Sequence, residues 1–302
     1  MRSKSIPREV QKQCVLGLAR GLKHASSGLS FDEKGYVATP EANLVPGLQL
    51  ADFEADLRAG AGAELDGKFR AAHSSCALAI NCFAPFRAGR MPLSIGRHQA
   101  LKIIGFEQKV STGLSRAQPP NLDLLAMGPD GLVALESKCT EYLSPKVAKF
   151  SDRYKDCITD RHPEGQPWFN EMLRLMDARG VGYQFLDAAQ LVKHALGLIH
   201  RGEKSTLVYL YWEPIDHPQS EIFRKHREEA DEFGKRVAGA NPSFEAMTYA
   251  ELWDAWDKSG HHELATHVRN LRSRYEVPAW SWEGVSWVNG RITNSGLLAD
   301  DD

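Results

Sequence analysis

The stretch that decides the fold is NLDLLAMGPDGLVALESKCT, residues 121–140. Its two apolar segments, Asn121–Met127 and Leu132–Thr140, have the composition of strands that are buried on both faces. The tetrapeptide GPDG separates them; its proline presets φ, and its glycines tolerate the strained positions of a turn. The stretch therefore predicts a tight β-hairpin with this tetrapeptide at its tip.

The register of this hairpin brings charged side chains together. A two-residue turn pairs Gly128 with Gly131, and counting outward from that pair places Asp123 opposite Glu136. Directly opposed residues of antiparallel strands share a face, with Cβ atoms about 5 Å apart. Lys138 lies on the same face because side chains alternate along a strand. We therefore expect two carboxylates and one amine on one face of the hairpin.

Two facing carboxylates in an apolar hairpin repel each other unless a cation neutralises them. Hard divalent cations bind carboxylate and carbonyl oxygens, and such a metal polarises a phosphoryl oxygen and lowers the pKa of a bound water. A lysine beside it can orient that water and offset charge in the transition state. The pattern thus favours metal-assisted phosphodiester cleavage, and a structural ion cluster is the alternative.

Two short segments, PNLD at residues 120–123 and ESK at residues 136–138, resemble the motif of the PD-(D/E)XK nuclease superfamily. The likeness covers roughly residues 64–213, and it is closest to a bacterial group of restriction endonucleases. The proline stands three positions before the aspartate rather than directly before it. The resemblance implies the restriction-endonuclease-like fold, an α/β class in which helices flank a mixed β-sheet core, here with helical additions at both termini.

The resemblance also implies roles for individual residues. Asp123 and Glu136 would bind Mg²⁺, or Mn²⁺ as its substitute, with the backbone carbonyl of Ser137 as a further ligand. Lys138 would be the catalytic lysine.

Four more residues are candidates for this site. Superfamily members often add an acidic metal ligand from the helix that precedes the sheet, which favours Glu64, while Glu107 on the first strand is its rival. Gln190 and His194 are four residues apart on the helix predicted after the hairpin. In the superfamily this helix can offer a polar group to substrate or metal, and a solvent-facing or packing role is the alternative.

The nucleic-acid interface must be local, because the net charge of the chain is only −2. Basic residues outnumber acidic ones between residues 87 and 116. They are candidates for phosphate contacts, with a solvated basic surface as the competing interpretation: Arg87, Arg90, Arg97, Lys109 and Arg116.

Hydrophobic spacing predicts the remaining elements. Strands are expected over residues 101–107 and 205–213, in addition to the hairpin. Helices are expected within 1–24, over 51–83 with a break at Gly60–Gly62 and resumption from Glu64 to Phe83, over much of 141–177, and over 184–201, 221–237, 249–258 and 262–275. We divide the chain into a basic N-terminal helix and loop (1–50), a nuclease core (51–215) and a helical C-terminal extension (216–302).

Composition limits the alternatives. The 302 residues include five cysteines without zinc-site spacing, no apolar run long enough for a membrane span, and no signal-peptide pattern at the N-terminus. A cytoplasmic protein without a membrane partner is expected.

The leading functional hypothesis is a Mg²⁺-dependent endodeoxyribonuclease, in a restriction or phage-defence role. DNA is its expected partner, and a methyltransferase is a further expected partner of a restriction enzyme. Cutting both strands with one site per chain requires a homodimer or two successive events. Two alternatives are a non-catalytic nucleic-acid-binding module with the same fold and a glycoside hydrolase that uses the carboxylate pair. Metal dependence distinguishes the nuclease from the glycoside hydrolase.

Overall fold

The computed structural model describes most of the chain, namely residues 5–26, 28–32, 35–60, 64–87, 89, 91–114, 118–144, 147–157, 163–177, 182–280, 286–288 and 291–293. Its centre is a six-stranded sheet in which the strands are neighbours in chain order. The first four are antiparallel, and the fifth and sixth run parallel to the fourth. The strands are β1 (Leu93–Ile95), β2 (His98–Lys109), β3 (Asn121–Gly128), β4 (Gly131–Lys138), β5 (Ser205–Tyr211) and β6 (Ser243–Thr248).

The predicted hairpin is confirmed. Strands β3 and β4 pair Gly128 with Gly131 and Leu124 with Leu135, which is the register expected from the two-residue turn. All eight residues of β4 except Gly131 are buried, because β3 and β5 flank the strand and helices cover both faces of the sheet. The expected α/β class, a mixed sheet flanked by helices, is therefore confirmed.

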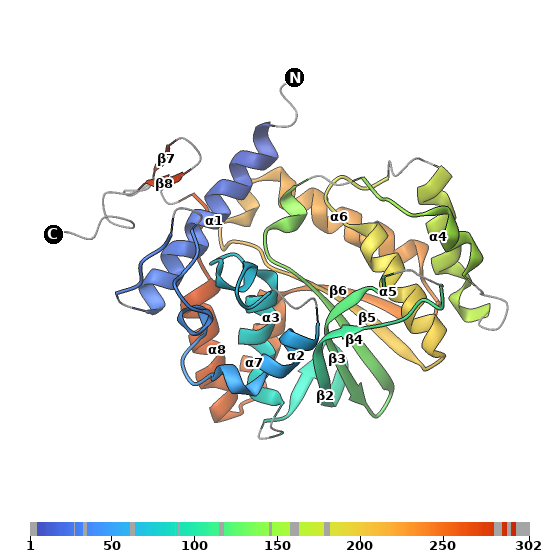
Figure 1. Cartoon of the computed structure of the whole chain (residues 1–302), viewed down its shortest axis with the longest axis horizontal. Coiled ribbons are helices and arrows are strands. Elements are labelled where there is room, and N and C mark those ends of the chain that lie inside the picture. The colour runs from blue at the N-terminus through green and yellow to red at the C-terminus, as the bar shows by residue number, and fades with distance from the viewer. Residues whose placement is uncertain are drawn as a thin grey trace.

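Eight α-helices surround the sheet in the described part of the chain (Figure 1). Side-chain contacts of β4 identify the two layers: Ser137 contacts α3 and α7 on one face, whereas Lys138 contacts α5 on the other. The long α1 packs against α8, which joins the two ends of the described chain. The helices are α1 (Ser5–Ala25), α2 (Glu54–Ala59), α3 (Ser75–Phe83), α4 (Gln166–Asp177), α5 (Ala188–Arg201), α6 (Glu221–Arg236), α7 (Tyr249–Asp257) and α8 (His262–Tyr275).

The helix predicted from Glu64 to Phe83 is wrong over its first half. Residues 64–74 form turns and one short 3₁₀ segment, and α3 begins only at Ser75. The side-chain amide of Asn43 donates hydrogen bonds to the backbone carbonyls of Phe69 and Ala71, at 2.6 and 2.9 Å. The Val37 amide also donates to the Arg70 carbonyl over 3.0 Å, and Tyr36 forms a β-bridge with Ala71, so these contacts hold the segment against residues 36–43 in a non-helical path.

Two further predictions need correction. Residues 141–144, 147–157 and 163–165, the described part of this region before residue 166, contain only short 3₁₀ segments, and the α-helix of that region starts at residue 166. The region after residue 215 is not purely helical, because β6 joins the central sheet next to β5. Residues 286–288 and 291–293 form a separate two-stranded ribbon, β7 (Ser286–Val288) and β8 (Arg291–Thr293). The division into three domains stays a prediction.

None of the described helices has both the length and the apolar composition that crossing a bilayer requires.

Candidate active site

A cavity of about 380 Å³ lies at the ends of β3 and β4. Its walls include the N-terminal ends of α3 and α5, which approach from opposite faces of the sheet. The structure brings seven of the predicted site residues together in this wall: Glu64, Glu107, Asp123, Glu136, Ser137, Lys138 and Gln190.

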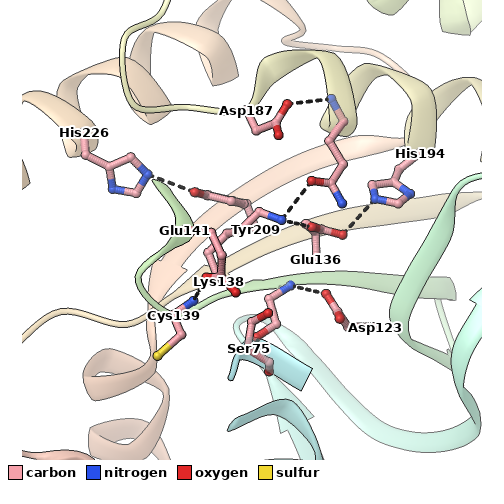
Figure 2. Close-up of polar contacts among 12 residues, drawn as sticks. Ser75, Asp123, Glu136, Lys138, Cys139, Glu141, Asp187, His194, Tyr209 and His226 are labelled. Carbon is pink, nitrogen blue, oxygen red and sulfur yellow. Dashed lines mark hydrogen bonds and ion pairs between the residues drawn. The ribbon is translucent and has the colours of Figure 1, made fainter. Parts of the chain in front are cut away.

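Asp123 lies where β3 and β4 part. Regular pairing ends at Leu124 and Leu135, and the Asp123 carboxylate accepts a hydrogen bond of 2.7 Å from the backbone amide of Ser137 (Figure 2). Burial raises the pKa of Asp123 well above its usual range, and the nearby charges of Glu136 and Glu107 raise it further. This half-buried acid is thus repelled by two carboxylates, while the charge of Lys138 and the Ser137 amide favour its ionised form.

Glu136 is held between two cationic or polar side chains (Figure 2). Lys138 forms a buried ion pair with one of its oxygens. The Nε2 atom of His194 lies 2.8 Å from the other oxygen, although the two groups do not have the geometry of a hydrogen bond. Burial opposes the charge of Glu136, but Lys138 and His194 together lower its pKa to about 2.

Lys138 is the amine of the cluster. Its ammonium donates to Glu136 and, over 2.8 Å, to Oε1 of Gln190. Burial would lower the pKa of Lys138, but the charges of Glu136, Glu141 and Asp123, with the hydrogen bond to Glu136, together outweigh burial and raise it.

Helix α5 presents Gln190 and His194 to this cluster. The helix starts at Ala188, and the side chain of Asp187 caps it by accepting a hydrogen bond from the Gln190 amide. Residues four apart then lie one above the other, so one contacts Lys138 and the other contacts Glu136. His194 is fully buried, whereas Gln190 is half-buried and lines the cavity.

Glu64 and Glu107 both line the cavity, so the structure does not separate these two rivals. Glu107, on β2, adopts a φ of +49° and accepts a hydrogen bond from the side-chain amide of Asn121. Burial raises its pKa to about 7; the Cys76 thiol opposes this shift, and the charges of Glu64 and Glu136 add to it. Glu64 lies in the turns that replace the predicted helix.

The predicted DNA-contacting residues do not line this cavity where they are described. Arg87 pairs with Asp56, and Lys109 donates to two carbonyls at the end of α2. Arg97 pairs with Glu245 and lines a different cavity beside the hairpin tip, at the opposite end of β4. Arg90 and Arg116 lie outside the described residues.

Sequence reasoning missed several residues of the cavity wall. Thr140 and Glu141 directly follow β4, so their proximity to Lys138 was a signal that the sequence contained. His73 lies just before α3, and Ser75 is the first residue of this helix. Their place in the cavity wall follows only once the start of the helix is known. Gln11 reaches the wall from α1 and donates to the carbonyl of Thr140, a contact with no local sequence signal.

The oxygen atoms of the cavity wall are ligands of the kind that a hard cation binds. The wall is rich in carboxylates, and one buried oxygen each of Glu136 and Asn121 has no hydrogen-bond partner in the described part of the chain. Because the Ser137 amide turns toward β3, its carbonyl turns the same way, toward Asp123. Within the described ranges, however, no group of three His, Cys, Asp or Glu side chains is already arranged to hold a metal. The acids fit Mg²⁺ by type and charge.

Comparison with families of known proteins shows what the chain is similar to. A family model described as "Restriction Endonuclease associating with ARP" matches residues 17–276. Searches of curated proteins and of solved structures found no match.

Proposed function

Because the chain belongs to the family described as Restriction Endonuclease associating with ARP, we propose that it is a metal-dependent endonuclease that hydrolyses DNA phosphodiester bonds. Family membership confirms the restriction-endonuclease-like resemblance of the sequence, and it indicates a nuclease-like role. The observation that carries the finer proposal is the convergence of Asp123, Glu136 and Lys138 in one cavity.

Each residue of this cluster has a role in the proposed reaction. Asp123, Glu136 and the Ser137 carbonyl would hold Mg²⁺, which supplies positive charge at a phosphoryl oxygen and acidifies a bound water. Lys138 uses two of its ammonium hydrogens on Glu136 and Gln190. The third is free, within the described residues, to donate to the attacking water or to the phosphate.

The contacts behind the cluster restrict its movement. His194 and Lys138 contact different oxygens of Glu136, so rotation of this carboxylate would break at least one contact. Asp123 is tied to the Ser137 amide, which keeps it next to the proposed carbonyl ligand. Such fixed donors need little rearrangement when charge develops in the transition state.

Plasmid cleavage tests the proposal. Supercoiled plasmids, prepared from methylating and non-methylating hosts, are incubated with the full chain in Mg²⁺, Mn²⁺ or EDTA. We expect cleavage only with metal, and a loss of about 100-fold or more in Asp123→Asn, Glu136→Gln and Lys138→Met, since each group acts at the reacting centre.

Matched changes at exposed positions of α6 and α7 serve as controls: Asp254→Asn, Glu228→Gln and Lys225→Met. They should cleave as the wild type does. If the wild type and the three cavity variants act identically on DNA and RNA with every metal, the nuclease proposal is wrong.

One observation favours a non-catalytic nucleic-acid-binding module as a second candidate. Glu136 is already neutralised by Lys138 and His194, so this acid does not require a metal to be stable in the fold. This candidate predicts DNA binding that is equal with Mg²⁺ and EDTA and unaffected by Asp123→Asn.

The partners follow from the proposed activity. DNA is the substrate, and the family description adds an association with ARP, which we extend to this chain as part of the proposal. Double-strand cleavage by one site per chain requires a homodimer or two events, and a restriction role adds a methyltransferase.

A further inference from the structure

The cavity continues past Lys138 to the first residues of α3 and the residues that follow β4. This part of the wall contains Ser75, Cys76, His73 and Thr140, none of which has a role in the proposed catalytic cluster. The hydroxyl of Ser137 donates to the carbonyl of Ser75 over 3.2 Å, so the start of α3 lies directly beside the cluster.

The N-terminus of α3 has two free amide groups. Ser74 caps the helix: its side chain accepts from the Ala77 amide at 3.1 Å, and its carbonyl accepts from the Leu78 amide at 3.0 Å. The amides of Ser75 and Cys76 have no acceptor among the described residues. The Cys76 thiol, rather than its amide, contacts Glu107. Free amides at the positive end of a helix form a ready site for an anion.

Two side chains of the same wall each have a buried polar atom that finds no partner among the described residues. Thr140 is 1% exposed, and its hydroxyl makes no hydrogen bond. Its backbone is fixed, because its carbonyl accepts hydrogen bonds from Gln11 and from the Leu143 amide. The Nδ1 atom of His73 is likewise buried and unpaired. Buried polar atoms in folded proteins nearly always have a partner, so a ligand or a water is expected here.

Charged groups of both signs lie near these donors, since the carboxylates of Glu64, Glu107 and Asp123 line the same cavity. Lys68 is exposed and lines the same wall. Glu141 also lines it, but its carboxylate accepts a hydrogen bond of 2.8 Å from the Cys139 amide. The wall thus presents free donors beside the proposed catalytic lysine.

We infer that the amides of Ser75 and Cys76, together with Thr140 and His73, form a subsite for a backbone phosphate of the substrate. The inference rests on the proposed function, because DNA supplies the phosphate next to the catalytic cluster. Helix amides and a hydroxyl bind phosphate oxygens without reading the base. The subsite therefore positions the strand without sequence preference.

Ser75→Pro tests the inference at the backbone. Ser75 is the first residue of α3, where proline is tolerated, and the preceding Ser74 has the extended conformation that proline requires (φ −70°, ψ 123°). The substitution removes one amide hydrogen and leaves the helix intact, whereas Ser75→Ala keeps the amide and is its matched control. Thr140→Val removes the hydroxyl with little change of shape, and Thr140→Ser restores it.

Binding is measured in the Asp123→Asn background with Mg²⁺, so that DNA stays intact. The probes are a fluorescein-labelled duplex and the same duplex with uncharged methylphosphonate linkages, followed by fluorescence anisotropy. We expect Ser75→Pro and Thr140→Val each to weaken binding of the normal duplex about tenfold, as expected for a lost hydrogen bond to a charged group. The uncharged duplex should lose no more than about twofold.

Thr112→Val, at a buried threonine of another cavity, should bind as the parent does. The inference is overturned if Ser75→Pro and Thr140→Val bind normally, if both duplexes lose affinity equally, or if the parent binds neither duplex. Thermal unfolding shows whether Ser75→Pro or Thr140→Val fails to fold. If one of them does, the binding result of the other tests the inference. Absence of cleavage with a positive binding result would remove the nuclease proposal alone.

Discussion

Asp123 shows how a single residue can be placed at a cost to stability. Its carboxylate is half-buried, faces the charges of Glu136 and Glu107, and receives only the Ser137 amide as a nearby donor within the strand pair. Its pKa is raised well above the ordinary value, so ionisation is less favourable in the folded chain than in the unfolded chain. Residues kept under such repulsion are frequent at functional sites.

Neutralising this acid should therefore stabilise the protein. For Asp123→Asn in EDTA at pH 8, we expect the free energy of unfolding to rise, because the amide carries no charge for Glu136 and Glu107 to repel. The gain should shrink toward pH 4, because protonation of the wild-type acid removes the same repulsion. Urea unfolding at both pH values measures it, with the exposed Asp254→Asn as control. A loss of stability at pH 8 would contradict the account.

At the scale of elements, α6 is anchored to the sheet through a neutral histidine. His226 is fully buried, and its Nε2 lies 2.9 Å from the hydroxyl of Tyr209 on β5. The ring of Tyr142 stacks on it with centroids 4.0 Å apart, and Tyr211 meets it edge-on. Burial and the charge of Arg227 lower the pKa of His226 to about 3. The packing of α6 thus depends on an imidazole that stays uncharged.

The stability of this contact should depend on pH in a defined direction. The folded pKa of His226 lies below the unfolded value of about 6.5, so protonation favours the unfolded chain. Above pH 7.5 this causes no loss in the free energy of unfolding, and the loss grows as the pH falls below 6.5. At pH 5 it amounts to about 2 kcal/mol. The variant His226→Gln should lack this part of the pH dependence, as measured by urea unfolding between pH 8 and pH 5.

The exposed His262 offers the control, because His262→Gln should keep the wild-type slope. Equal slopes for the wild type and His226→Gln would show that His226 accepts a proton without loss of packing.

At the scale of the whole molecule, the first and last parts of the chain share one core. Strand β6 completes the sheet beside β5, and Trp256 of α7 packs against Phe83 and Phe86. The buried Arg274 of α8 donates to the carbonyls of Leu18 in α1 and Ala72. These contacts cross the boundary that the sequence suggested at residue 215.

A chain shortened to residues 1–215 should therefore not fold. It would expose the apolar surface that α7 and α8 cover, and it would leave β5 as an unpaired edge. We expect weak far-ultraviolet circular dichroism and rapid proteolysis. A chain of residues 1–280 keeps every described helix and the six-stranded sheet, and it should resist protease as the full chain does. A protease-resistant 1–215 fragment would support the predicted domain division instead.

The parts that sequence reasoning recovered are those specified by short-range rules. The turn tetrapeptide sets the register of β3 and β4, and the register determines which side chains share a face. The apolar spacing after Glu64 is real, but Asn43, more than twenty residues earlier, binds the carbonyls of Phe69 and Ala71 and helps hold this segment outside a helix. Hydrophobic periodicity contains no information about a distant amide.

What the sequence determined alone is the hairpin and its register, because a tight turn and strand alternation are local geometry. That register is enough to bring Asp123, Glu136 and Lys138 to one cavity. Only the tertiary structure decided what surrounds them. Helix α5 brings His194 to Glu136, and β2 brings Glu107 toward Asp123, while the late start of α3 leaves the Ser75 amide free beside the cavity. These contacts join residues that are distant in the chain, and burial of the whole core, rather than any local pattern, brings them together.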